Sequence, residues 1–92
     1  MMKCGTPKDY SSDVYKIYFE VAECKGIALS ILESYLGPYY SKNIIHLTFG
    51  YEVFMPIQSV PDVIRLLNEK NIALYQVVRR EKADLIWIPP RN

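Results

Sequence analysis

Few side chains in this 92-residue chain have types and spacing that could support chemistry. His46 is the single histidine, and the two cysteines, Cys4 and Cys24, lie far apart in the sequence. A metal site needs several nitrogen, sulfur or carboxylate ligands at short spacing, and a catalytic histidine needs a partner that orients it. We therefore predict no metal site, no catalytic residues and no cofactor.

Cys24 is the best candidate for a reactive side chain, because it precedes a predicted helix whose N-terminus would favour a thiolate. The adjacent Lys25 is the only neighbour that could act as its base, so we interpret Cys24 as an ordinary loop cysteine. The carboxylates Glu20, Glu23 and Glu33 do not form the spaced pair that a glycoside hydrolase needs. Phosphate-binding and dinucleotide-binding glycine patterns are absent from the sequence.

The composition indicates a small globular protein, with 50% hydrophobic and 23% charged residues. The formal net charge is +1, and Arg79-Arg80 is the largest basic cluster, so we do not expect nucleic-acid binding. No segment is typical of a signal peptide or a membrane span, and two cysteines are too few for a disulfide scaffold. We predict a cytoplasmic protein with reduced thiols. Eight tyrosines are more than a short chain can bury, which indicates a contact surface.

Residues 13–22 alternate between apolar and more polar side chains, as in a strand that is covered on one face. The sequence then turns at Gly26 into a predicted helix, which we expect to end at Gly37-Pro38. Its apolar face contains Ala28, Ile31, Leu32 and Tyr35. Residues 1–12 lack periodicity and predict a flexible N-terminal arm, and residues 13–92 predict a single α+β domain.

The segment 39–57 admits three interpretations: one long strand, a hairpin that turns near Gly50, or a turn at residues 41–43 after a short strand at Tyr39-Tyr40. We prefer two strands joined as a hairpin, because parallel neighbours cannot be joined by a short loop. A second helix follows, with Ser59 as its predicted N-cap and Asp62 as a capping-box partner. Its apolar stripe is Val60, Val63, Ile64 and Leu67, and Asn71 is its expected left-handed cap.

The last predicted strand covers residues 72–78, and residues 79–82 are expected to form a charged turn. The apolar residues 85–88 suggest an additional C-terminal strand, which would pair with the preceding one or with a neighbouring subunit. The order strand, helix, two strands, helix, strand predicts a ferredoxin-like βαββαβ sandwich, with two helices on one face of an antiparallel sheet. The other sheet face would then carry Lys16, Tyr18, Glu20, Ala22, His46, Thr48 and Phe54.

The segment Lys25–Leu36, placed after a strand, resembles the first turn and helix of ACT domains. These are small ferredoxin-like regulatory modules that pair through their sheets and bind amino acids or similar effectors. Cys24 and Lys25 stand where that family has an acidic residue and often a proline. The resemblance implies that the backbone N–H groups of Gly26 and Ile27, next to Cys24, bind a ligand carboxylate; the alternative is that Gly26 simply permits a tight turn.

We therefore predict a non-catalytic, ACT-like domain that forms a homo-oligomer through its sheet and binds a small effector. The interface candidates are Tyr18, Phe54 and Trp87. The alternative is a protein-interaction or structural module without a small ligand. A third hypothesis, an RNA-binding sheet surface, uses Tyr18, Phe49, Tyr51 and Phe54, but the segment 46–51 lacks the Lys/Arg-Gly opening of known RNA-binding sheets.

Overall fold

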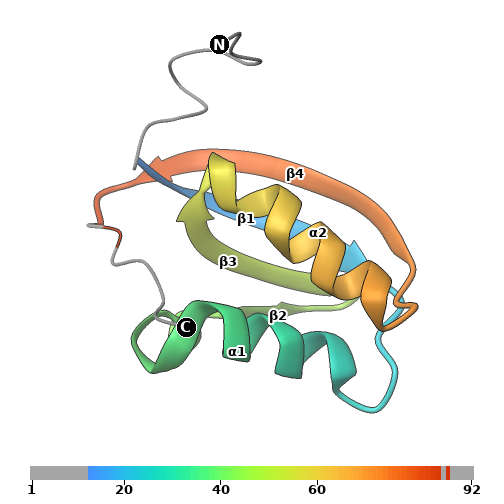
Figure 1. Cartoon of the computed structure of the whole chain (residues 1–92). Helices are drawn as coiled ribbons and strands as arrows, with labels where there is room; N and C mark the ends of the chain where they lie inside the picture. The colour runs from blue at the N-terminus through green and yellow to red at the C-terminus, as the bar shows by residue number, and fades with distance from the viewer. Residues whose placement is uncertain (1–12, 86, 88–92) are drawn as a thin grey trace, which may run out of the picture.

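The computed structural model describes residues 13–85 and residue 87, and predictions for residues 1–12, 86 and 88–92 lie outside this part of the chain. The flexible N-terminal arm predicted for residues 1–12 is one of these predictions. Figure 1 shows four strands and two principal helices in one compact unit. Their bounds are β1 Val14–Val21, α1 Ile27–Ser41, β2 Ile45–Leu47, β3 Gly50–Pro56, the 3-10 turn η2 Ile57–Ser59, α2 Val60–Glu69 and β4 Leu74–Ala83.

The four strands form one antiparallel sheet in the spatial order β2-β3-β1-β4. Both helices cover the same face of this sheet, and no helix of the described residues covers the opposite face, which is called the open face below (Figure 1). The α+β class, the element order and the two-layer ferredoxin-like arrangement predicted from the sequence are confirmed. Within this order β1 and β3 are the central strands, and β2 and β4 are the two edges.

The core lies between the sheet and the helices and is built on the alternation in β1. Tyr15, Ile17, Phe19 and Val21 all face the helices and are at most 8% exposed. Side chains of a strand point alternately to the two faces, so the sequence pattern identified this buried face correctly. The partners from the other elements include Ala28, Leu32, Leu36, Tyr40, Val53, Met55, Val63, Leu67 and Ile72.

Helix α1 continues past the point at which we expected it to end. Gly37 has non-helical backbone angles (φ 78°, ψ 175°), but the chain resumes a helical turn that runs to Ser41. Glycine tolerates this left-handed angle, so the predicted stop becomes a kink. The extra turn buries Tyr40, which is 1% exposed. Tyr40 therefore belongs to a helix, and the short strand considered at Tyr39-Tyr40 is wrong.

The predicted hairpin in the segment 39–57 is confirmed, with Thr48 and Phe49 as its two-residue turn between Leu47 and Gly50. The turn precedes Gly50 instead of containing it. Gly50 lies against β1 so closely that a β-carbon added there would overlap the carbonyl oxygen of Phe19. The glycine is thus required by the close approach of two strands and not by a bulge.

Helix α2 begins at Val60 after η2, and its buried residues are Val63 and Leu67. Ser59 occupies the N-cap position but makes no side-chain capping hydrogen bond, so the capping box predicted there is wrong. Asp62 instead accepts a hydrogen bond from the Tyr35 hydroxyl of α1 (3.2 Å), which links the two helices.

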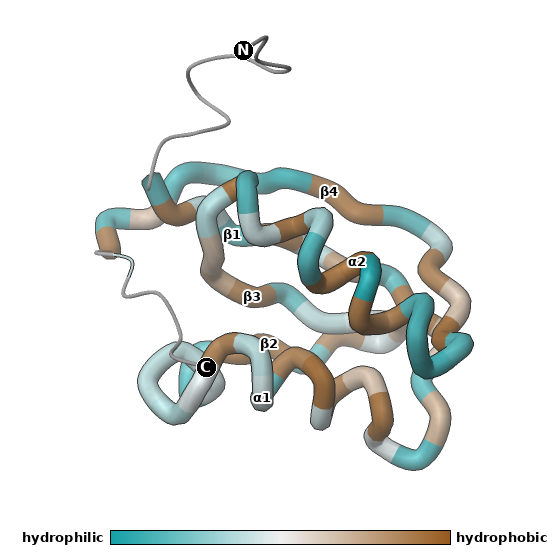
Figure 2. Tube along the Cα trace, in the orientation of Figure 1, coloured by the Kyte–Doolittle hydropathy of each residue, from teal (hydrophilic) through white to brown (hydrophobic). Residues whose placement is uncertain are grey.

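β4 is longer than the sequence suggested, because the residues expected to form a charged turn, Arg79–Lys82, lie within the strand. An edge strand tolerates charged side chains, since water reaches its outer side. Against β1, β4 contains one extra residue at each of two register shifts. The charged end of β4 appears as a hydrophilic stretch in Figure 2.

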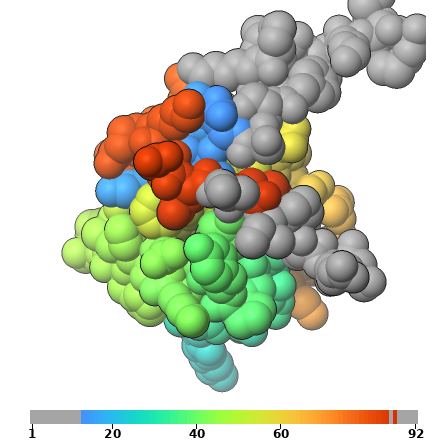
Figure 3. All heavy atoms as spheres, turned by 90° about the vertical axis from the view of Figure 1, so that its left-hand side faces the viewer, coloured from blue at the N-terminus to red at the C-terminus, as the bar shows by residue number. Residues whose placement is uncertain are grey.

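The chain leaves β4 after Ala83, and none of the described residues beyond it belongs to a strand. The additional C-terminal strand is therefore not observed in the part of the tail that the structure covers. Leu85 and Trp87 instead pack against the core. The Trp87 ring stacks on Tyr40, with ring centroids 5.0 Å apart, and Figure 3 shows the last described residues lying against the end of α1.

Candidate functional site

The turn between β1 and α1 contains Cys24, Gly26 and Ile27, for which the ACT resemblance implies a ligand. Lys25 and Gly26 both adopt left-handed backbone angles (φ 54° and 78°), the φ pattern of a type I′ turn. The Ile27 N–H donates to the Cys24 carbonyl oxygen at 3.0 Å and closes the turn. Gly26 therefore supplies a backbone conformation that other residues adopt only with strain.

The carboxylate of Glu23 lies at the N-terminus of α1. Its Oε1 accepts hydrogen bonds from the backbone N–H groups of Cys24 (2.8 Å) and Ala28 (2.9 Å). Its Oε2 accepts from the N–H of Leu29 (3.0 Å) and from the hydroxyl of Tyr51 (2.6 Å). The first N–H groups of a helix have no partner inside the helix, and the positive end of the helix dipole favours an anion. Glu23 satisfies both requirements from within the chain.

The two ionisable members of this cluster shift in opposite directions. Partial burial raises the pKa of Glu23, but the hydrogen bonds from Tyr51 and from three backbone N–H groups outweigh it, so that the net pKa is below its ordinary value. Burial, followed by the hydrogen bond to Glu23 and its negative charge, raises the pKa of Tyr51 to about 12. At neutral pH Glu23 is thus an anion and Tyr51 a neutral donor.

This cluster changes the interpretation of the Gly26 turn. The Ile27 N–H is used to close the turn, and the helix N–H groups of Ala28 and Leu29 are bonded to Glu23. The helix N-terminus next to the predicted ligand site thus already holds a carboxylate of the protein itself. Cys24 is exposed, with a free thiol. Sequence analysis missed Glu23 as a capping residue, although it lies one position before the place where ACT domains have an acid.

Of the other residues considered for chemistry, His46 contacts Tyr51 of the Glu23 cluster, whereas Glu20 bonds to β4. His46 lies on the helix side of the hairpin, not on the open face as expected, and its ring meets Tyr51 edge to face at 5.3 Å. Glu20 accepts a hydrogen bond from Gln76 across the strands (2.9 Å). Within residues 13–85 and 87, no group of three His, Cys, Asp or Glu side chains could hold a metal ion.

Comparison of the chain with protein-family models, curated proteins and solved structures finds no match. The ACT resemblance therefore remains a prediction that depends on the turn, the helix and the element order. No helix among the described residues is long and apolar enough to cross a membrane.

Two of the three predicted interface residues, Tyr18 and Phe54, lie on the open face of the sheet, as expected. Tyr18 is nevertheless only 8% exposed, because the Arg80 guanidinium lies over its ring at 5.3 Å. Phe54 is half-buried. The third residue, Trp87, packs on Tyr40 of its own chain.

Ion pairs cover much of the open face. Lys16 pairs with Glu81 at 3.1 Å, and Arg80 pairs with Glu52 at 2.6 Å. The carboxylate of each pair offsets a positive charge that could otherwise attract a phosphate backbone. Of the four aromatic residues considered for RNA stacking, only Tyr18 and Phe54 are on this face.

The two edges of the sheet differ in character. β4 carries four consecutive charged residues and two register shifts, devices that keep a sheet edge from pairing with another chain. β2 is exposed at all three of its positions, and the segment 43–51 contains no Asp, Glu, Lys or Arg. Ile45 is 37%, Leu47 43% and Phe49 68% exposed. The β2 edge is therefore short and apolar, and it carries no formally charged side chain.

Proposed function

We propose that this protein is a non-catalytic, ACT-like cytoplasmic domain that assembles with copies of itself through its sheet and binds a small effector. The observation that carries the proposal is the exposed apolar edge strand β2, set against the charged edge strand β4. An edge strand leaves backbone N–H and C=O groups that can pair with another strand, and no charged side chain of β2 opposes this. The free thiol of Cys24 supports a reducing compartment.

A second copy of the chain is the partner that fits the β2 edge best. Antiparallel pairing of β2 with the same strand of the copy, with the two-fold axis at His46, places Ile45 of one chain beside Leu47 of the other. Both residues lie on the open face of the sheet, since they pair with Glu52 and Gly50 of β3. The contact is self-complementary, as a two-fold interface requires, and no formally charged side chain opposes it.

Light scattering coupled to size-exclusion chromatography tests the assembly. We expect a dimer for the wild type and a monomer for Leu47→Glu. Each new carboxylate would face Ile45 of the other chain and would have no partner, which should weaken the dimer at least about a hundred-fold. Tyr75→Glu is the matched control: it adds the same charge at an exposed aromatic residue of β4 and should leave the dimer intact. A monomeric wild type at high concentration would contradict the assembly and favour the alternative of a module that binds another protein.

The effector half of the proposal is tested separately. Thermal-shift measurements against panels of amino acids, other small carboxylates and nucleotides should reveal at least one stabilising class. A flat response across all panels would remove effector binding and leave the domain as an interaction module.

A further inference from the structure

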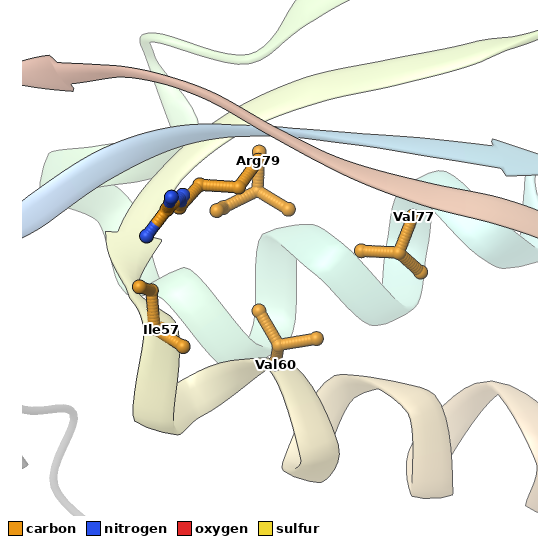
Figure 4. A pocket seen from close by; sticks show the side chains of 5 residues that line it. Ile57, Val60, Val77 and Arg79 are labelled. Carbon is orange, nitrogen blue, oxygen red and sulfur yellow. The ribbon is translucent and has the colours of Figure 1, made fainter. Parts of the chain in front are cut away.

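A cavity of about 300 Å³ opens between the sheet and the start of α2. Figure 4 shows side chains from three elements around it: Ile57 from η2, Val60 from α2, and Val77 and Arg79 from β4. Ile17 of β1 completes the lining. This volume is at the small end of the range for ligand-binding pockets. At about 30 Å³ for each water-sized group, it has room for about ten non-hydrogen atoms.

The apolar side chains that line this cavity have little rotational freedom. All four are β-branched residues, whose side chains have few rotamers, so they do not swing easily into the space. Ile17 is also 1% exposed and held within the core. The cavity is therefore preformed, which lowers the cost of ordering a ligand site.

Arg79 provides the single charge at this cavity. It pairs with Ile17 of β1 and so lies on the helix face of the sheet. Its guanidinium is 5.2 Å from the centre of the Tyr15 ring, a cation–π contact that orients it. Among the described residues no carboxylate forms an ion pair with Arg79, whereas Arg80 pairs with Glu52 at 2.6 Å and Lys82 pairs with Asp13 at 3.5 Å.

We propose that this cavity binds a short aliphatic monocarboxylate, with the carboxylate on Arg79 and the hydrocarbon chain against Ile57, Val60 and Val77. A guanidinium binds a carboxylate through two parallel hydrogen bonds, and the aliphatic walls match a saturated chain. This ligand class specifies the small effector of the proposed function, and the proposal rests on effector binding.

The same lining argues against a free amino acid as the ligand. Its side chains are four hydrocarbons and one cation, so none of them can accept a hydrogen bond from an ammonium group. In leucine the ammonium group adjoins the carboxylate, so it would lie next to the Arg79 guanidinium, and two positive charges repel each other. Leucine and 4-methylpentanoate differ only in this ammonium group, so the two compounds form a matched pair of probes.

Titration calorimetry and amide chemical-shift mapping test the proposal. We expect 4-methylpentanoate to bind, with shifts concentrated at Ile57, Val60 and Val77. Leucine and the uncharged 4-methylpentanamide should bind at least about ten-fold more weakly. Arg79→Gln should weaken binding of the carboxylate about ten- to hundred-fold, the usual effect of losing a charged hydrogen bond. The matched control Arg80→Gln removes the neighbouring cation, on the open face, and should not change the affinity.

The failure of this inference can be told apart from failure of the proposed function. If leucine binds as well as 4-methylpentanoate, or if Arg79→Gln binds unchanged, the assigned ligand class is wrong while effector binding stands. If 4-methylpentanoate does not bind to the wild-type protein, the proposal that the cavity is its site is overturned. The Leu47→Glu variant should retain full affinity, because β2 lies at the opposite edge of the sheet from β4.

Discussion

Replacing Glu23 by glutamine should destabilise the fold far more than an exposed residue usually does. The four groups bonded to its carboxylate are all donors: three backbone N–H groups and the hydroxyl of Tyr51. Glutamine keeps one acceptor oxygen and turns an NH₂ donor toward the other pair. Two hydrogen bonds are then lost, and the other two lose their assistance from the charge.

The expected cost follows from these contacts. Loss of helix N-capping costs about 1 kcal/mol, and loss of a charged acceptor for Tyr51 costs about 1.5 kcal/mol or more in a buried setting. Because Glu23 is exposed and solvent screens its charge, we expect about 2 kcal/mol in total. For a domain of this size that lowers Tm by about 8–16 °C.

Thermal unfolding by circular dichroism measures the change, with Glu33→Gln as the matched control. Glu33 is an exposed carboxylate on the same helix and makes no hydrogen bond or ion pair with another described residue, so its replacement should cost less than about 0.5 kcal/mol. If Glu23→Gln shifts Tm no more than this control does, the reasoning from the capping contacts is refuted.

The pH dependence of the same two proteins gives a further check. The pKa of Glu23 is lowered in the folded state from its ordinary value of 4.5. Its stabilisation is therefore present above that value and is lost as the pH falls through the lower folded pKa. The difference in stability between wild type and Glu23→Gln should shrink on acidification below about pH 4. A difference that is constant down to pH 2 would contradict a role for the ionised carboxylate.

Two further predictions concern residues around this cluster. Tyr51 has a pKa raised from 10.0 to about 12. The stability that this shift contributes should therefore be lost as the pH rises from 10 to 12, by at most about 2–3 kcal/mol. Denaturant unfolding should show that the free energy of unfolding of Tyr51→Phe falls less than that of the wild type over this pH range. Gly50→Ala should cost more than about 3 kcal/mol, because the added carbon meets the backbone of Phe19, whereas Gly26→Ala, which enters open space at φ 78°, should cost about 1–2 kcal/mol. Equal costs for the two glycine variants would contradict the close approach at Gly50.

The Glu23 cluster also explains which parts of the site could be predicted from sequence. The tight turn at Gly26 was expected, because glycine is common where the chain turns sharply between a strand and a helix, and the left-handed angle there agrees with it. The hydrogen bond between Tyr51 and Glu23 could not be predicted, because Tyr51 lies 28 positions away. The two residues meet only after β3 has paired with β1. Local spacing contains no signal for such a contact.

The charged end of β4 and the end of α1 illustrate the same limit. A run of four charged residues is typical of a turn, but β1 pairs with both ends of this run, at Arg79 and Lys82, and solvent or opposite charges satisfy the side chains. Gly37 followed by Pro38 is typical of a helix end, but burial of Tyr40 and its stacking with Trp87 stabilise one more turn. In both places tertiary contacts outweigh a local preference.

The sequence by itself determined the order of the elements and the buried face of β1, because periods of two and of about 3.6 residues report directly which side chains share a face. It also determined that helices would cover only one side of the sheet. Only the tertiary structure decided that Glu23 caps the N-terminus of α1, that β2 is the apolar edge of the sheet, and that Arg79 lies beside an aliphatic cavity. These features join residues that are distant along the chain, and their distances depend on strand register and helix placement.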